Sequence, residues 1–265
     1  MLLTVNIGNS HIFAGIFDNS GKIALRFKIS SDKNKTADEY RLIFQSVIEQ
    51  HGGKIQNIDA AIIASVVPQL TYTLCDTIRD MVNITPTVVG PGVKTGFPIK
   101  IDSPAELGGD MVANTAAAIV YIKEFGRSDS PTIIVDMNTV TTVSAISKNG
   151  EYIGCSIFPG IQMSFDSMHG NTAQLPNVSL VAPNRYIGKN TQDSVRSGVI
   201  FGHAMLIDGF VSRFSKEMHC KTGDLNLIIT GEYAKYILSE RGDQFYYDDT
   251  LTLKGLYYIY LNNIK

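Results

Sequence analysis

Short apolar runs separated by polar turns open the chain. The runs Leu2–Asn6 and Ile12–Phe17 lie on either side of Gly8-Asn9-Ser10. A second polar turn, Asp18-Asn19-Ser20-Gly21, follows the second run. Apolar runs of this length around a tight polar turn are typical of a β-hairpin. The next apolar stretch, Ile23–Ile29, is predicted to be a third strand.

Helical spacing follows these strands. Within Thr36–Gln50 the apolar residues recur three and four positions apart, and they are Tyr40, Ile43, Phe44, Val47 and Ile48. This period is typical of an amphipathic helix. Ala60–Val67 has the composition of a buried strand and stops at Pro68, and Leu70–Met81 is predicted to be a second helix. The first half of the chain is therefore predicted to be a βββαβα-like unit.

The same pattern returns later in the chain. Thr132–Asp136 is an apolar run that ends in a carboxylate, and Val140–Ile146 follows it as a further strand. From Asn6 to Gly21 is 15 positions, and from Asp136 to Gly150 is 14. Leu225–Thr230 then corresponds to Ala60–Val67. Strands that alternate with helices in both halves predict an α/β fold built by duplication.

The two halves are predicted to join near Phe125–Pro131, with domains at residues 1–118 and 119–265. If they face each other, a cleft between them would be lined by the polar turns that follow their first strands. The tyrosine-rich end, Tyr257, Tyr258 and Tyr260, is interpreted as a packing helix.

Composition excludes some classes of function. The 265 residues are 44% hydrophobic and 18% charged, with 23 Lys and Arg against 25 Asp and Glu and a net charge of -2. A balanced chain carries no electrostatic footprint for nucleic acid or for an anionic membrane. No stretch approaches the ~20 apolar residues of a membrane span, and no secretion signal is recognised. A cytoplasmic protein is expected.

Two turns at equivalent positions carry candidate chemistry. The turn after Leu2–Asn6 is small and hydroxylated, and Asp136–Thr142 offers a carboxylate and three threonines. Small residues in tight turns allow backbone N–H groups to approach phosphate oxygens, and carboxylates can hold Mg²⁺. A single turn of this kind is more often an ordinary hairpin, while two at equivalent positions leave an ordinary hairpin pair and a phosphate-binding cleft equally open. A Walker loop is absent from the sequence.

Gly108-Gly109-Asp110 precedes an alanine-rich helical stretch, Val112–Tyr121. Two interpretations of Asp110 remain open: a helix cap, or a general base for a substrate hydroxyl. The five histidines lack metal-ligand spacing, and His11 is of interest because it lies in the first polar turn.

Four framework segments, in order and spacing, resemble the type III pantothenate kinases. They are Ser65–Pro68, Val89–Gly96, Gly188–Thr191 and Leu251–Leu256. The resemblance runs nearly end to end. It implies two duplicated RNase H-like domains of the actin/hexokinase-like superfamily with a cleft between them. It also implies a homodimer that phosphorylates pantothenate with ATP and Mg²⁺, as the first step of coenzyme A biosynthesis, in the presence of K⁺ or NH₄⁺.

The resemblance also assigns roles to residues of this chain. Asp110 matches the proton-abstracting aspartate, and Asp136 matches the aspartate that binds the monovalent cation. The implied ATP-binding residues are Asn6, Ile7, Gly8, Asn9, Ser10, His11, Ile12, Phe13 and Thr139. The implied pantothenate-binding residues are Ile101, Leu107, Gly108, Gly109, Asp110, Met111 and Thr191.

Several pocket positions depart from the family pattern. Asn6 stands in place of a metal-holding aspartate, Met111 in place of an arginine, and Ile101 in place of a tyrosine. Asn138, Cys155 and Glu232 each stand in place of a glycine. At position 138, a side chain is expected to obstruct a phosphate loop. Two interpretations follow. The chain is a divergent pantothenate kinase, or it is an impaired or repurposed paralogue that binds another ligand, regulates, or phosphorylates another small alcohol.

Overall fold

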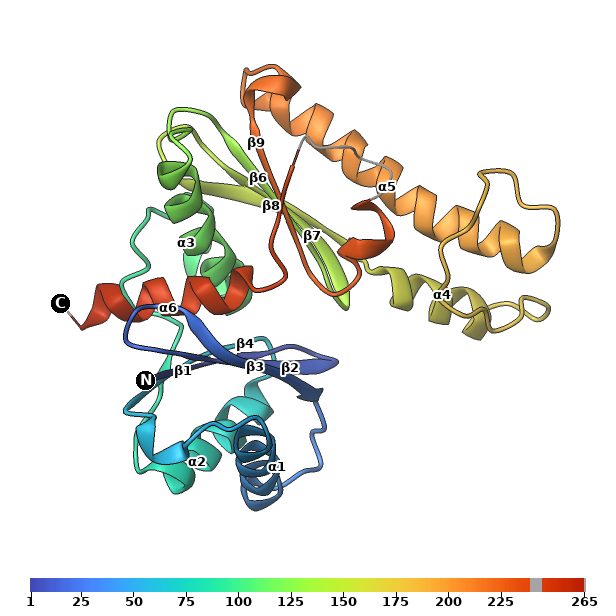
Figure 1. Cartoon of the computed structure of the whole chain (residues 1–265). Coiled ribbons are helices and arrows are strands. Elements are labelled where there is room, and N and C mark those ends of the chain that lie inside the picture. The colour runs from blue at the N-terminus through green and yellow to red at the C-terminus, as the bar shows by residue number, and fades with distance from the viewer. Residues whose placement is uncertain (239–244, 265) are drawn as a thin grey trace. The chain divides into compact units, whose positions relative to one another are not determined.

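The computed structural model describes residues 1–238 and 245–264 and divides the chain into two compact units (Figure 1). Unit 1 comprises Met1–Pro98, Asp102–Val120 and Thr250–Lys265, and unit 2 comprises Ile99–Ile101 and Tyr121–Asp249. The C-terminal segment therefore belongs to the unit that contains the N-terminus. The division into domains at residues 1–118 and 119–265 stays a prediction.

Unit 1 is built on a five-stranded sheet in the order β3-β2-β1-β4-β5. Its strands are β1 (Leu2–Ile7), β2 (His11–Phe17), β3 (Ile23–Ser30), β4 (Ala60–Ser65) and β5 (Thr87–Val88). β2 runs antiparallel to both β1 and β3, while β4 runs parallel to β1 and β5 runs parallel to β4. The predicted hairpin and third strand are confirmed. β4 ends at Ser65, two residues earlier than expected, because Pro68 begins the next helix.

The alternation of side chains along β1 assigns its two faces. Leu3, Val5 and Ile7 are buried in one core with α1 (Ala37–Gln50) and α2 (Pro68–Val82). Successive side chains of a strand point to opposite faces, so Thr4 and Asn6 lie on the other face. There β1 contacts α6 (Leu251–Asn263). The predicted helices of the first half are confirmed, and α1 begins with a capping box between Thr36 and Glu39.

Unit 2 repeats this topology in the order β10-β9-β6-β7-β8. Its strands are β6 (Thr132–Met137), β7 (Val140–Ile146), β8 (Tyr152–Pro159), β9 (Asn226–Thr230) and β10 (Tyr246–Tyr247). β7 runs antiparallel to β6 and β8, and β9 runs parallel to β6 and β10. Strand order and directions match those of unit 1, which confirms the predicted duplication.

Two helices, α4 (Ile161–Gly170) and α5 (Thr191–Glu217), were not predicted from the sequence, and a third, α3 (Gly109–Glu124), is longer than predicted. α4 and α5 share one core with β6, β7 and β9. α3 is longer than the predicted Val112–Tyr121 and includes Asp110 in its first turn. Short 3-10 helices lie at Ile55–Asn57, Pro104–Glu106, Thr222–Asp224 and Ala234–Tyr236.

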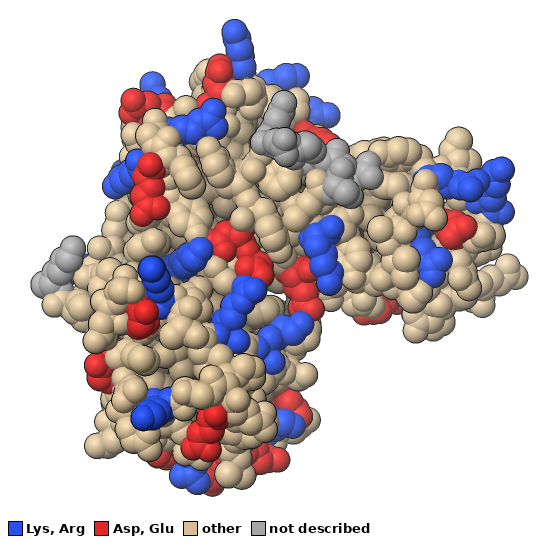
Figure 2. All heavy atoms as spheres, viewed as in Figure 1, with Lys and Arg blue, Asp and Glu red and all other residues tan. Residues whose placement is uncertain are grey.

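The C-terminal tyrosines belong to α6, as predicted for a packing helix. The ring of Tyr257 stacks on that of Phe17, with 4.7 Å between the ring centroids and 17° between the planes. Within the described residues, no helix is long and apolar enough to cross a membrane. On the face shown in Figure 2, basic and acidic side chains are interspersed.

Candidate active site

The turn between β1 and β2 is closed by its own backbone. The Gly8 N–H donates to the His11 carbonyl oxygen at 3.0 Å, and Ile7 pairs with Ile12 in the ladder. The side chains of Asn9 and Ser10 are exposed at its tip. The structure therefore brings the predicted ATP-binding residues Asn6 to Phe13 together in one hairpin.

Ser31 supports this turn from the end of β3. Its Oγ donates to the Gly8 carbonyl oxygen at 2.6 Å, and its N–H donates to the Ser10 carbonyl oxygen at 2.9 Å. Nothing in the local sequence pattern marks Ser31, because the two segments are brought together by the β2–β3 pairing.

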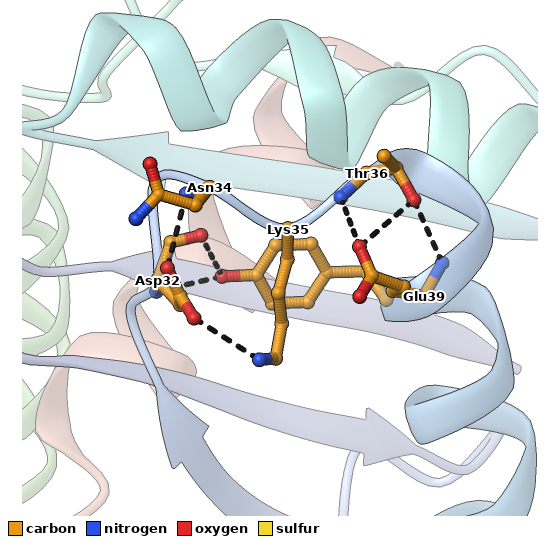
Figure 3. A network of polar contacts seen from close by, with 6 residues as sticks. Asp32, Asn34, Lys35, Thr36 and Glu39 are labelled. Carbon is orange, nitrogen blue, oxygen red and sulfur yellow. Dashed lines mark hydrogen bonds and ion pairs between the residues drawn. The ribbon is translucent and has the colours of Figure 1, made fainter.

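The segment after Ser31 is itself fixed, as Figure 3 shows. The hydroxyl of the buried Tyr40 donates to the Asp32 carbonyl oxygen at 2.9 Å and accepts from the Asp32 N–H at 2.8 Å. The Lys35 ammonium lies 3.1 Å from the Asp32 carboxylate. This network ties the support of the first turn to the start of α1.

Asn6 combines burial with an unused oxygen. The residue is 7% exposed, and its Oδ1 has no hydrogen-bond partner within the described residues. A buried polar atom without a partner costs free energy unless something else satisfies it. Carbonyl oxygens are among the ligands of Mg²⁺, so this atom fits a divalent cation as a neutral oxygen donor.

The first turn of α3 packs on Ala64 of β4, the residue that pairs with Asn6 of β1. Asn6 pairs with Ala64 in the parallel ladder of β1 and β4, and their side chains share a face. Gly109 lies over Ala64, where an added Cβ would come 3.2 Å from the Ala64 Cβ. The small residues Gly109 and Ala64 allow α3 to begin close to the end of β4. Asp110, the next residue of α3, therefore lies near β4, the strand that pairs with the strand of Asn6.

Asp110 is not the cap of α3. The helix begins at Gly109, so Asp110 is its second residue, and its Oδ1 accepts a 2.8 Å hydrogen bond from the Met111 N–H. Burial raises the pKa of the partly buried Asp110 carboxyl, and hydrogen bonds from the backbone N–H groups of Met111 and Asp110 offset part of that rise. A carboxylate with a raised pKa is a better proton acceptor, which suits a general base.

The corresponding strand of unit 2 carries a row of polar side chains. Asp136 on β6 is 6% exposed and pairs in register with Thr142 on β7 and Thr230 on β9. Residues paired in this way share a face of the sheet. The carboxylate is therefore flanked by hydroxyl-bearing residues on both neighbouring strands.

The turn that follows Asp136 is linked to the turn after β9. The Asn138 Nδ2–H donates to Asp136 Oδ1 at 2.6 Å, and the Glu232 N–H donates to Asn138 Oδ1 at 3.1 Å. Thr139, the predicted phosphate-side residue, is in the same turn, and its carbonyl oxygen accepts from the Gly160 N–H at 3.2 Å. Unit 2 therefore brings Asp136, Asn138 and Thr139 together.

Two glycines allow the turn after β9 and the end of β8 to pack closely against the β6–β7 turn. Gly231 has φ +99°, and a Cβ there would overlap the main chain of Met137. A Cβ at Gly160 would overlap the carbonyl oxygens of Asn138 and Thr139. Sequence reasoning did not single out either glycine for packing. The signal available was their position directly after a strand.

The remaining predicted substrate-binding residues are divided between the two units. Ile101 and Thr191 both belong to unit 2, and Ile101 follows Lys100, whose N–H donates to the Tyr152 carbonyl oxygen at 2.8 Å. Thr191 begins α5 and lines a polar surface pocket of about 570 Å³, with Gln174, Pro176, Asn190, Gln192 and Asp193. Leu107 and Gly108 precede α3 in unit 1. Within the described chain, no group of three His, Cys, Asp or Glu residues could hold a metal ion by itself.

The fold is shared with solved structures of low sequence identity. A Baf family protein from Campylobacter jejuni superposes with a TM-score of 0.59 at 21% identity, covering 99% of this chain and 98% of that one. The activator of the 2-hydroxyisocaproyl-CoA dehydratase from Clostridium difficile, solved with bound ADPNP, gives a TM-score of 0.53 at 12% identity, covering 99% and 94%. The chain thus has the same duplicated α/β fold as these proteins, with two five-stranded sheets of matching strand order.

Sequence similarity narrows this fold class to one family. The model of the type III pantothenate kinase family matches residues 2–213. The type III pantothenate kinase of Moorella thermoacetica is 39% identical over 263 residues, 99% of this chain and 100% of that protein. The enzyme of the same name from Shouchella clausii is 37% identical over 264 residues, again 99% and 100%. The chain belongs to the type III pantothenate kinase family.

Proposed function

We propose that this protein phosphorylates pantothenate with ATP, giving 4'-phosphopantothenate in the first step of coenzyme A biosynthesis. The observation that carries this proposal is Asp110. Its carboxyl is partly buried with a raised pKa, and Asp110 is in the first turn of a helix whose first residue, Gly109, packs on Ala64, the residue paired with Asn6. The full-length similarity to enzymes named type III pantothenate kinase supports the choice of substrate.

In the proposed reaction, the Asp110 carboxylate accepts the proton of the primary hydroxyl of pantothenate. The hydroxyl oxygen then bonds to the γ-phosphorus of ATP as ADP leaves. Phosphoryl transfer requires mainly positioning and electrostatic stabilisation. Gly108, Gly109, Met111 and Leu107 flank the proposed base, while Thr191 and Ile101 complete the proposed pantothenate-binding set.

The nucleotide side is assigned to the turns of the two sheets. The hairpin Asn6–Phe13 is proposed to approach the phosphates with its backbone, and Thr139 is proposed to contact them from unit 2. Asn6 Oδ1 would hold Mg²⁺, because it is a buried oxygen without another partner among the described residues. Mg²⁺ supplies charge neutralisation on the phosphate oxygens.

Asp136 is proposed to hold K⁺ or NH₄⁺. Asp136 is buried and pairs in register with Thr142 and Thr230, whose hydroxyl oxygens are further potential cation ligands, and this arrangement supports the proposal. A monovalent cation there would supply positive charge near the phosphates. We also propose a homodimer that acts in the cytoplasm, where ATP is available. No observation among the described residues favours a repurposed paralogue over the kinase.

The proposal is tested with purified protein, ATP, Mg²⁺ and pantothenate, with and without K⁺ or NH₄⁺. Mass spectrometry detects phosphopantothenate directly. Product that forms with wild type and is lost in Asp110→Asn supports the kinase assignment. Glu106→Gln is a matched control, because Glu106 is an exposed carboxylate a few residues before the base. Wild-type protein that binds ATP but makes no product under these conditions contradicts the assignment.

A further inference from the structure

The Asn138 carboxamide uses both of its ends. Its Nδ2–H donates to Asp136 Oδ1 at 2.6 Å, and its Oδ1 accepts from the Glu232 N–H at 3.1 Å. An amide nitrogen only donates and a carboxylate only accepts. The reversed amide would place oxygen against the carboxylate and NH₂ against an N–H, so the surroundings determine its orientation. Asn138 therefore bridges a buried carboxylate and the backbone of another turn.

The bridge lies where two strand ends are already docked. The Tyr233 N–H donates to the Met137 carbonyl oxygen at 2.9 Å, and Gly231 packs without a Cβ on the Met137 main chain. These two contacts fix the turn after β9 to residue 137. Of these three links, the Asn138 side chain is the one that reaches the carboxylate of Asp136.

Asn138 occupies its turn without backbone strain. Among the described non-glycine residues, positive φ values occur at Asn83 and His219. A glycine is therefore not required at position 138 by conformation. The expectation that the Asn138 side chain obstructs the phosphate loop stays a prediction. The side chain does make two hydrogen bonds, to Asp136 and to Glu232, that a glycine cannot make.

We propose that Asn138 is a positioning residue, which orients the Asp136 carboxylate and joins it to the Gly231–Glu232 turn as one rigid unit of the nucleotide and cation site. The inference rests on the proposed function, since it concerns how that site is held. With Oδ1 bound to Asn138, rotation of the Asp136 carboxylate is restricted. Groups that hydrogen-bond a cation ligand commonly change metal affinity or activity 10- to 100-fold when they are removed.

Three variants separate this role from a general structural one. Asn138→Gly removes both hydrogen bonds. Asn138→Asp has nearly the same size and keeps an acceptor for the Glu232 N–H, but it places a second carboxylate against Asp136. Asn149→Gly is the matched control, because Asn149 is an exposed asparagine in the β7–β8 turn of the same sheet.

The variants are compared in three measurements. Kinetics give the activation constant for K⁺ and the KM values for ATP and pantothenate. Calorimetry gives the affinity for ATP with Mg²⁺ at low and high K⁺. Amide hydrogen exchange reports the protection of the Glu232 N–H.

In Asn138→Gly, we expect the K⁺ activation constant to rise about 10- to 100-fold, while the pantothenate KM changes less than twofold. In Asn138→Asp, the second carboxylate repels that of Asp136 and adds negative charge beside the cation, so we expect the K⁺ activation constant to differ from the wild-type value. Exchange at Glu232 should accelerate in Asn138→Gly and stay slow in Asn138→Asp. The proposal is overturned if both variants match Asn149→Gly. It is also overturned if Asn138→Asp retains wild-type constants, because the link to Asp136 is then dispensable.

Calorimetry keeps the inference separate from the kinase assignment. If wild type makes no phosphopantothenate, the proposed function fails. The inference then stands if K⁺ strengthens ATP binding in wild type and in Asn149→Gly and this effect is lost in Asn138→Gly. It falls if K⁺ acts equally on wild type and Asn138→Gly, or if wild type binds no ATP.

Discussion

Asn6 and Asp136 occupy equivalent positions in the two sheets. Each is the next-to-last residue of a strand that pairs antiparallel with the following strand and parallel with the fourth strand of its sheet. Asn6 pairs in register with Phe13 and Ala64, whereas Asp136 pairs with Thr142 and Thr230. One topological position thus carries a neutral amide in unit 1 and a carboxylate in unit 2.

Asp110→Asn is expected to lower kcat by ~10²-fold or more, because removal of a general base typically costs this much. Asn has nearly the same shape and can still accept from the Met111 N–H. Single-turnover kinetics against the Glu106→Gln control measure the effect. Turnover equal to that of the control would remove Asp110 from the mechanism.

The raised pKa of Asp110 also predicts how pH acts on rate and stability. The base must be ionised, so kcat/KM should fall as pH drops through a pKa above the 3.8 of an unperturbed aspartate. The folded pKa lies above the unfolded one, so ionised Asp110 destabilises the fold above that folded pKa. Asp110→Asn should therefore keep or raise Tm at pH 7, and its difference from wild type should shrink in acid. A clearly lower Tm at pH 7 contradicts this.

Much of the fold follows from the sequence, while the details of the site depend on tertiary contacts. Alternating runs and turn residues predict β1 to β3 and the repeat beginning at Thr132, since these signals are local. The bridge from Asn138 to Glu232 joins residues 94 positions apart, so no local pattern predicts it. The same holds for Ser31, whose support of Gly8 depends on strand pairing.

Gly231→Ala is expected to destabilise the protein more than Gly150→Ala. Both glycines have positive φ, +99° and +76°, which costs an alanine roughly 1–2 kcal/mol. A Cβ at Gly150 meets nothing within 4 Å, whereas one at Gly231 overlaps the Met137 main chain. We expect an additional ~1–3 kcal/mol for that overlap. Equal losses in free energy of unfolding, measured by denaturant titration, would show that the turn relaxes without cost.

The proposed homodimer requires an apolar surface that a second copy can cover. Val112 and Ala117, in the alanine-rich stretch, are buried within the chain. Met205 and Leu206 on α5 remain 60% and 48% exposed. We expect light scattering after size exclusion to give about twice the monomer mass of 29.0 kDa.

Substitutions test whether the exposed apolar side chains of α5 form the proposed dimer interface. Met205→Glu with Leu206→Glu should shift the mass toward 29.0 kDa. Leu42→Glu should leave it unchanged, since Leu42 is an exposed leucine on a different helix, α1, with 63% of its surface accessible. A monomeric wild type at micromolar concentration is the result that contradicts the dimer.

Asn6→Asp is expected to bind Mg²⁺ more tightly and to fold less stably without it. A carboxylate adds the charge that the amide lacks, and ligand charge tunes cation affinity, so we expect roughly tenfold tighter Mg²⁺ binding in the presence of ADP. Without the metal, a buried carboxylate with no partner should lower Tm by a few degrees.

Asn226→Asp is the matched control for this prediction. Asn226 is also a buried amide whose Oδ1 has no partner within the described residues, and it lies at the opposite end of β9 from the site. Thermal unfolding in EDTA and in Mg²⁺ with ADP measures both variants. Mg²⁺ should restore the Tm of Asn6→Asp and not that of Asn226→Asp, because a ligand stabilises a protein only through a site that it occupies in the folded state. Equal restoration in both variants would mean that the effect of Mg²⁺ does not arise at Asn6, and the metal would then have to be assigned to other oxygen donors.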